Sequence, residues 1–474
     1  MTEPNDRRDA SPGVAQPAEA ELLRDLLRSP SYLRALLFCA LIGIPVSLAA
    51  FWFLAGLHAL QNVLWDDLPH TLGWDSPPWW WPLPLLPMAG LVVGLVVSRL
   101  TGAGGHIPAS GLHAGGVGPS ALPGVVIAAV ASLPLGAVLG PEAPLIAFGG
   151  GLALLFRKVA RRPGTPQSDA LLGAAGAAAA IAVIFGNPLV AAVLLIEVAG
   201  VGGPRLVAVM LPALLSSGVG SLVFTGFVRW TGLRTGGLAL RFPGPPTLLD
   251  IGDVGWSVVV AAFLGVLLRL VFAGGRLTAA YVSGRPLPRT VLCALGAGCC
   301  ASLYAVVTGR SPAEVASSGQ ATLADLVADP HAWGTGALVA VLLFKAVGYA
   351  LCLGSLRGGP VFPALFLGAA FGLLLSPLPG LGVVPGVAAG MAAAVAGALR
   401  LPVSSAVLVV LLLRDAETIP VVVLSVVVAF VTGELVPAGP KVVPVPARPP
   451  RRREAAGGRG GARGGEEQGA SERG

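Results

Sequence analysis

The chain has 474 residues, of which 54% are hydrophobic and 12% are charged, and its mean hydropathy is +0.80. A soluble domain carries about 25% charged residues and a disordered chain has low hydrophobicity, so this composition excludes both classes. The net charge of +7 lies mostly in the two tails and a few short loops, which indicates membrane orientation and not a nucleic-acid-binding surface.

Apolar runs of uneven length follow one another along most of the chain. Because a spanning helix needs about 20 apolar residues, several of these runs are too short to cross a bilayer alone. Short runs broken by glycine and proline must be shielded by protein or line a cavity, since unpaired backbone groups are costly in lipid. The sequence therefore predicts an all-α membrane protein with broken and re-entrant helices, over residues 31–62, 82–100, 120–139, 144–158, 168–185, 188–200, 205–229, 253–274, 288–308, 334–353, 361–376, 383–398, 402–413 and 418–436.

The placement of lysine and arginine predicts the topology. Cytoplasmic segments are enriched in these residues, so we expect the arginine-bearing N-terminal tail, residues 1–30, to lie inside. The loop at 61–82 holds Asp66, Asp67 and Asp75 and no Lys or Arg, which suits the outside. Residues 437–474 are rich in Pro, Gly and Arg and predict a disordered basic tail. We expect a multi-pass protein of the cell membrane (plasma or inner) with both termini in the cytoplasm.

The membrane region, residues 31–436, consists of two similar halves at about 31–230 and 250–436. The segment GPEAP at 140–144 matches GPVFP at 359–363, and a glycine follows each, Gly149 and Gly368. Alanine-rich segments at 175–182 and 389–396 also match, and each precedes a proline, Pro188 and Pro402. Repeated halves with helix breaks at matching positions are typical of transport proteins whose binding site lies at the breaks. Helix N-termini meeting there would each present about half a positive charge, which suits a passing anion.

Glu142 separates two apolar runs, so we expect it at or near the membrane interior. A carboxylate at that depth is costly and is a functional candidate by default. In a site suited to anions, a negative side chain competes with the anion and protonation releases it. We therefore interpret Glu142 as a gate with pH dependence. The alternative is an interfacial glutamate that caps a helix.

Two further glycine–proline motifs indicate only turns when each is taken alone. The first is GGHIP at residues 104–108, where glycines allow close backbone approach and Pro108 suits the first turn of a helix. The second is GGPVFP at 358–363, which Arg357 precedes. His106 and His113 have no third ligand in view, so we predict no metal and no cofactor.

Together, in this order and at these separations, the three motifs resemble those of the CLC family of chloride channels and chloride/proton antiporters. The family signatures Gly-Ser-Gly-Ile-Pro, Gly-Arg/Lys-Glu-Gly-Pro and Gly-x-Phe-x-Pro are similar to residues 104–108, 140–144 and 359–363. The resemblance covers about residues 31–436. It implies the CLC-like inverted two-repeat architecture and a homodimer with one anion pathway per subunit.

The resemblance also implies roles for individual residues. Glu142 matches the family's gating glutamate. The implied partners are chloride or another small anion and the lipid bilayer. We expect no nucleic acid as a partner and no enzymatic activity. The segments that line the anion site are matched by Gly105, His106, Ile107, Pro108, Gly140, Pro141, Gly359, Pro360, Val361 and Phe362.

The chain departs from the family pattern at several positions. Gly105 replaces the serine that contacts the central anion, and Pro360 lacks the N–H of the family residue. The central tyrosine near the last helix has no counterpart, since no tyrosine follows Tyr349. Many proton-coupled members carry an inward-facing glutamate directly after the one that matches Glu197, and that position is Val198 here.

The missing second glutamate favours a voltage-gated-type chloride channel, in which anions pass passively through a pathway gated by Glu142. The alternative is a chloride/proton antiporter of the same family. An intramembrane enzyme would need a converging nucleophile and base, which the sequence around Glu142 does not offer. A membrane scaffold without transport would leave the paired helix breaks unexplained. Fluoride, nitrate and bromide stay open beside chloride.

Overall fold

The computed structural model describes residues 21, 24–25, 27–113, 117–200, 204–232, 240, 242, 248–437, 439–440 and 442. Most of the predicted tails at 1–30 and 437–474 lies outside these residues. Within the described ranges the regular structure is helical, and the one pairing of extended backbone is an isolated antiparallel bridge between Gly140 and Gly359. The predicted all-α class is confirmed.

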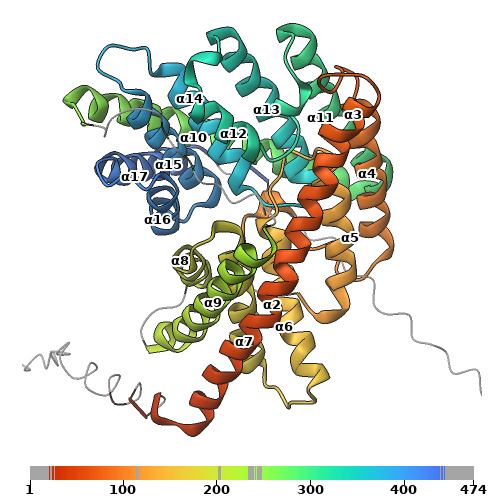
Figure 1. Ribbon diagram of the computed structural model, residues 1–474, viewed down its shortest axis with the longest axis vertical. Helices are drawn as coiled ribbons and strands as arrows, with labels where there is room; N and C mark the ends of the chain where they lie inside the picture. Colours follow the sequence, from red (N-terminus) through yellow and green to blue (C-terminus); the bar gives the residue numbers. More distant parts are fainter. Residues whose placement is uncertain are drawn as a thin grey trace, which may run out of the picture.

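Proline opens many of the helices, as expected of a residue with a fixed φ and no N–H to leave unpaired. Figure 1 shows α6 to α9 gathered in the lower part of the molecule and α14 to α17 at the upper left. The helices are α2 (Pro30–Asn62), α3 (Leu68–Thr71), α4 (Pro82–Arg99), α5 (Leu122–Ser132), α6 (Glu142–Val159), α7 (Pro166–Phe185), α8 (Pro188–Ala199), α9 (Pro204–Thr231), α10 (Ile251–Gly284), α11 (Pro286–Thr308), α12 (Gln320–Ala328), α13 (Thr335–Ser355), α14 (Val361–Leu375), α15 (Val383–Leu399), α16 (Pro402–Leu413) and α17 (Ile419–Leu435).

These bounds follow the predicted apolar runs closely, with three differences. The run at 120–139 is helical only as far as Ser132, because Pro134 lacks an N–H and Gly136 adopts a φ of +102°. Helix α10 continues past the predicted end at residue 274 to Gly284. Helix α12 was not predicted, because its nine residues include polar ones and form no long apolar run.

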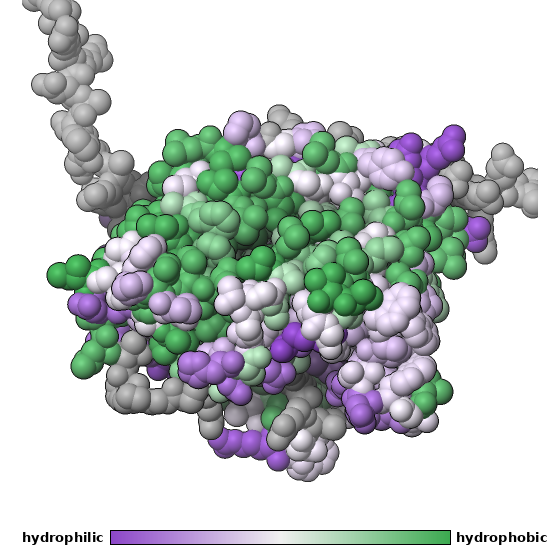
Figure 2. Space-filling model, turned by 90° about the horizontal axis from the view of Figure 1, so that it is seen from above, coloured by the Kyte–Doolittle hydropathy of each residue, from purple (hydrophilic) through white to green (hydrophobic). Residues whose placement is uncertain are grey.

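Seven helices among the described residues are long and apolar enough to cross a membrane, and six apolar helices are shorter. Large apolar side chains such as Leu222 (76% exposed) and Leu270 (55% exposed) point outward from these helices. Figure 2, which looks down on the molecule from above, shows apolar residues covering much of that face. An apolar exterior of this extent fits lipid and not water.

Matching helix pairs of the two halves pack through matching glycines. Gly149 of α6 packs against Gly176 of α7, and Gly368 of α14 packs against Gly390 of α15. A Cβ atom at any of these four positions would collide with the backbone of the facing helix. Small residues of this kind let membrane helices approach closely. The positions that match in the sequence thus make equivalent contacts in the structure.

Candidate anion site

The second and third motifs meet at the bridge between Gly140 and Gly359. The Gly140 amide donates to the Gly359 carbonyl at 2.8 Å, and the Gly359 amide donates to the Gly140 carbonyl at 2.5 Å. A Cβ atom on either residue would collide with the side chain of Glu142. Glycine is therefore required on both sides, and this bridge holds the N-terminus of α6 beside the N-terminus of α14.

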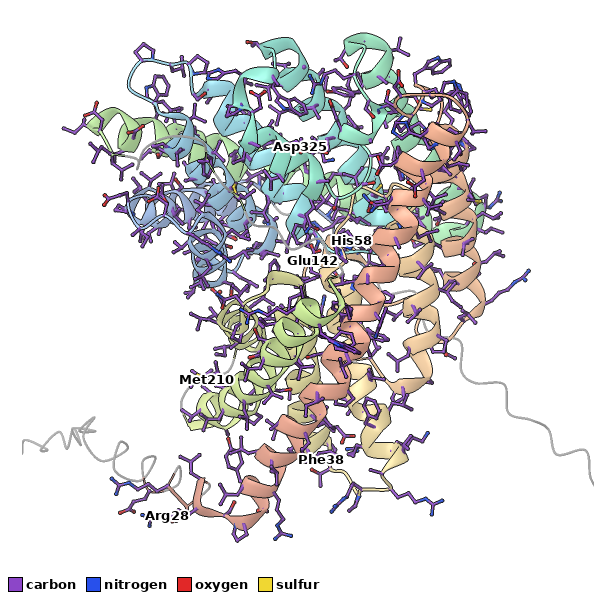
Figure 3. The ribbon with its side chains drawn as sticks, in the orientation of Figure 1. Arg28, Phe38, His58, Glu142, Met210 and Asp325 are labelled. Atoms are coloured by element: carbon purple, nitrogen blue, oxygen red, sulfur yellow. The ribbon has the colours of Figure 1, made fainter. Side chains whose placement is uncertain are left out.

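Glu142 lies inside the protein, with 1% of its surface exposed, as the first residue of α6. One carboxylate oxygen, Oε1, accepts a hydrogen bond from the backbone amide of Val361, the first residue of α14. The other oxygen, Oε2, is buried and has no hydrogen-bond partner among the described residues. Figure 3 shows Glu142 in the middle of the molecule. The carboxylate is therefore neither at the lipid surface nor in open water.

Two helix N-termini thus converge on one carboxylate. Each contributes unpaired N–H groups and about half a positive charge, and together they favour a negative group between them. At the start of α14 the side chains of Val361 and Phe362 are apolar, and Pro360 and Pro363 have no N–H. The nearest donors on this helix are therefore the backbone amides of Val361 and Phe362. Such an arrangement can hold a negative group by dipoles alone, which permits its release more readily than a fixed cation does.

Tyr349 of α13 supports the turn at Pro360, directly before α14. Its hydroxyl is fully buried and donates to the carbonyl of Pro360 at 2.6 Å. On the other side, the ring of Phe362 stacks on Phe185 at the end of α7, with centroids 5.8 Å apart. Sequence reasoning gave Tyr349 no role, because a tyrosine within an apolar run gives no sign of which distant carbonyl it will meet.

The first motif adjoins the third through Arg357. This buried guanidinium donates from Nε to the carbonyl of Ala103 at 3.2 Å, and a Cβ at Gly104 would lie 3.5 Å from the Arg357 Cγ. Pro108 opens only a three-residue 3-10 turn, η2 (Pro108–Ser110), instead of an α-helix. The carbonyls of Ile107 and Pro108 accept hydrogen bonds from Ser110 and Gly111 within the same turn. The structure thus joins this turn to Arg357, two residues before Gly359, but records no contact between residues 105–108 and Glu142 among the described residues.

His106 belongs to the same turn, outside the spanning helices, and its ring stacks on that of His113 at 4.5 Å. Partial desolvation, the neighbouring His113 and the positive charge of Arg357 lower the pKa of His106. His106 is therefore neutral at neutral pH and supplies no fixed cation. A search of the described residues finds no cluster of three metal-ligating side chains.

A small cavity is lined in part by Pro141, the residue before Glu142. It has a volume of about 20 Å³, which is room for roughly one water molecule. Its polar lining comes from His58 and Gln61 of α2 and from Ser318 and Gln320. Figure 3 labels His58 and Glu142 in neighbouring positions.

Lys345 of α13 holds the loop that lines this cavity. Its side chain is completely buried, and the three N–H groups of Nζ are shared among four consecutive carbonyls, those of Glu314 (3.1 Å), Val315 (3.0 Å), Ala316 (3.4 Å) and Ser317 (3.3 Å). The ammonium also lies 4.7 Å from the ring centroid of Phe366. In turn, the amide of Ser317 donates to the carbonyl of Gly136 at 2.9 Å, so the loop is tied to the segment that leads to Glu142.

Glu197, near the C-terminal end of α8, links the two halves of the chain. Its carboxylate accepts hydrogen bonds from the amides of Val403 (3.1 Å) and Ser404 (2.6 Å) and from the Ser404 hydroxyl (2.6 Å). It therefore caps the N-terminus of α16, which has no side-chain cap of its own. Val198 follows it and offers no titratable group.

Comparisons with known proteins show which family the chain belongs to. Residues 89–434 match the family model described as "Voltage gated chloride channel". The Escherichia coli (strain SMS-3-5 / SECEC) protein named "Putative ion-transport protein YfeO" is 30% identical over 351 residues, which cover 70% of this chain and 77% of that protein.

Solved structures show the same fold. A slow cyanobacterial Cl⁻/H⁺ antiporter matches with a TM-score of 0.68 at 18% identity, over 85% of this chain and 94% of that one. A CLC-type fluoride/proton antiporter matches with a TM-score of 0.64 at 20% identity, over 86% of this chain and 97% of that one. The resemblance stated from the three motifs is confirmed: this chain is a multi-pass membrane protein that belongs to the CLC family of anion-transport proteins, and not an enzyme.

Proposed function

We propose that this protein exchanges a small halide anion, chloride or fluoride, for protons, and that Glu142 is the gate. The observation that carries the proposal is the position of the Glu142 carboxylate, which accepts the Val361 amide at the junction of two helix N-termini. A backbone amide at a helix N-terminus is what a halide would use for binding. The carboxylate and the halide then compete for one place.

Protonation decides that competition. The ionised carboxylate accepts the hydrogen bond of the Val361 amide and so prevents the halide from binding there. When Glu142 takes up one proton it loses its negative charge, so it no longer competes with the halide and can leave. The halide then binds the freed amides, and loss of the proton returns the carboxylate. The carboxylate and the halide thus occupy the site alternately, so that uptake and loss of a proton by Glu142 are linked to binding and release of the halide.

The rest of the proposed anion site consists of backbone. In this proposal the site comprises Gly140, Pro141, Gly359, Pro360, Val361 and Phe362, and its second part is the turn of Gly105, His106, Ile107 and Pro108. The support is the bridge between Gly140 and Gly359, the Val361 amide on Glu142, and the bond from Arg357 to Ala103, two residues before that turn. The donors available to a halide are the amides of Val361 and Phe362, because Pro360 and Pro363 have none. No cofactor is part of the proposal.

Antiport is preferred to the passive channel favoured by the sequence, because two of the matching structures are titled as proton-coupled antiporters of chloride and fluoride. The passive channel stays the second candidate on one observation. Val198 occupies the position at which many proton-coupled members of the family carry a second glutamate. The neighbouring Glu197 accepts hydrogen bonds from the first amides of α16 and so caps that helix.

The domain limits, topology and assembly are part of the same proposal. Residues 31–436 form the transport domain in two repeats, with the termini in the cytoplasm. A homodimer is supported by apolar side chains that point outward from α8, α9 and α16, including Leu189, Leu215 and Val403.

Purified protein in liposomes tests the function directly. A chloride or fluoride gradient imposed without a proton gradient should drive protons in the opposite direction, as recorded by a pH-sensitive dye. Halide flux that moves no protons would replace antiport with the passive channel. Absence of halide flux in wild-type protein would overturn both.

A further inference from the structure

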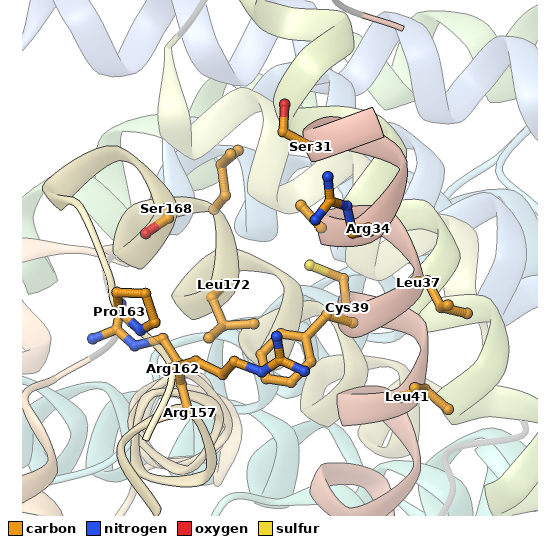
Figure 4. A pocket seen from close by; sticks show the side chains of 13 residues that line it. Ser31, Arg34, Leu37, Cys39, Leu41, Arg157, Arg162, Pro163, Ser168 and Leu172 are labelled. Carbon is orange, nitrogen blue, oxygen red and sulfur yellow. The ribbon is translucent and has the colours of Figure 1, made fainter. Parts of the chain in front are cut away.

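A pocket of about 590 Å³ opens far from Glu142, where α2 begins and α6 passes into α7. Figure 4 shows its two walls, with Leu37 and Leu41 of α2 on one side and Leu172 of α7 on the other. The lining is mostly apolar, and Phe38 and Cys39 contribute to it. The pocket is large enough for part of an acyl chain and too apolar to suit a free ion.

The polar groups of this pocket are concentrated in three arginines. Arg34 comes from α2, Arg157 from the last turn of α6 and Arg162 from the connection to α7. Arg157 is paired with Asp169 through Nη2 and Oδ2 at 3.0 Å. Arg34 donates only from Nε, to the carbonyl of Pro30 at 3.0 Å, and among the described residues Arg162 has no recorded side-chain partner. Two guanidinium groups are thus available to an anion.

The pocket is also continuous with the apolar exterior. Leu37 and Leu41 are 61% and 55% exposed, so the α2 wall faces lipid directly. On the other face of the same connection, a second pocket shares Arg157 and Arg162 and adds Lys158 and Arg161. This density of Lys and Arg places this end of the molecule at the inner leaflet, where anionic lipids are concentrated.

We propose that this pocket binds an anionic phospholipid of the inner leaflet. One acyl chain lies along the apolar wall between α2 and α7, and the phosphate accepts hydrogen bonds from Arg34 and Arg162. Guanidinium groups suit a phosphate because their planar N–H groups match its oxygens in pairs. The apolar wall makes the ligand a lipid and not soluble phosphate. The site is independent of the gate proposed at Glu142.

The test is lipid retention by the full-length protein in mild detergent, measured by native mass spectrometry. Phosphatidylglycerol and phosphatidylcholine of equal chain length are the probes, and glycerol phosphate is the soluble competitor. The variant R34Q/R162Q removes both guanidinium groups, which are exposed and contribute little to folding. The matched control is R99Q, an exposed arginine in the last turn of α4 that does not line the pocket. The variant A35W fills the pocket and keeps every arginine.

Wild-type protein and R99Q should retain phosphatidylglycerol over phosphatidylcholine. R34Q/R162Q should bind phosphatidylglycerol about 25-fold more weakly, since each of the two arginines near an anionic surface contributes about fivefold. A35W should lose the lipid as well. Equal retention by R34Q/R162Q and R99Q would overturn the proposal. So would full displacement by glycerol phosphate together with normal binding to A35W, because the ligand would then be phosphate alone.

Discussion

The Glu142 carboxylate accepts a hydrogen bond from the amide of Val361, which lies in the other half of the chain. Each residue is the first of its helix, α6 and α14. A bridge between Gly140 and Gly359 fixes the two helix starts side by side. One titratable group is therefore positioned where two helix dipoles favour a negative charge, with a second oxygen, Oε2, that has no partner.

Replacement of Glu142 by Gln should raise halide flux severalfold and remove its dependence on pH and its coupling to protons. The neutral amide cannot ionise, so it no longer competes with the halide for the Val361 amide. Stopped-flow or electrode measurements of halide efflux from liposomes at several pH values check this. E417Q, which neutralises an exposed acid outside the site, is the control and should behave like wild type. Pumping of protons by E142Q would contradict the gate.

Replacement of Gly359 by Ala should displace the Glu142 side chain. A Cβ atom at this position would collide with the carboxyl group, and the residue has no room to move because its backbone pairs with Gly140. We expect flux that is insensitive to pH, as for E142Q, with some loss of thermal stability. G56A is the control, since a Cβ there meets nothing within 4 Å. Normal coupling in G359A would show that the carboxylate does not depend on this close approach.

Replacement of Tyr349 by Phe should lower stability by about 1–3 kcal/mol, because the buried carbonyl of Pro360 loses its hydrogen bond. Since this carbonyl belongs to the turn that presents the Val361 amide, halide affinity should fall too. Thermal unfolding and halide titration calorimetry measure the two effects. Y281F removes a hydroxyl from an exposed tyrosine and should change neither. Unchanged halide affinity in a folded Y349F protein would show that the turn does not depend on the Tyr349 hydroxyl.

Replacement of Lys345 by Met keeps most of the side chain's volume and removes its charge. The carbonyls of residues 314–317 then stay buried without a donor, so we expect a loss of about 3 kcal/mol or more. K158M, at an exposed lysine, is the control. Thermal unfolding in detergent measures the stability of both variants, and only K345M should be less stable than wild type. A K345M protein as stable as wild type would mean that the loop satisfies its carbonyls in another way.

Much of the fold could be predicted from the sequence because glycine and proline mark the breaks between apolar runs. The same residues made the two halves recognisable, and Glu142 was conspicuous because carboxylates are rare among apolar residues. The supporting contacts could not be predicted. Tyr349 and Lys345 act on carbonyls that their own helix does not provide, and a single sequence does not show such pairings. The first motif, taken alone, indicated only a turn, and the structure has the three-residue turn η2 there.

Halide binding to purified protein as a function of pH tests the central competition most directly. For wild-type protein, calorimetry should show affinity that rises as pH falls, because protonation removes the carboxylate from the Val361 amide. For E142Q, affinity should be high and constant across the same range. Equal affinities and parallel pH profiles for the two proteins would contradict the account, since the halide would then bind without reference to Glu142.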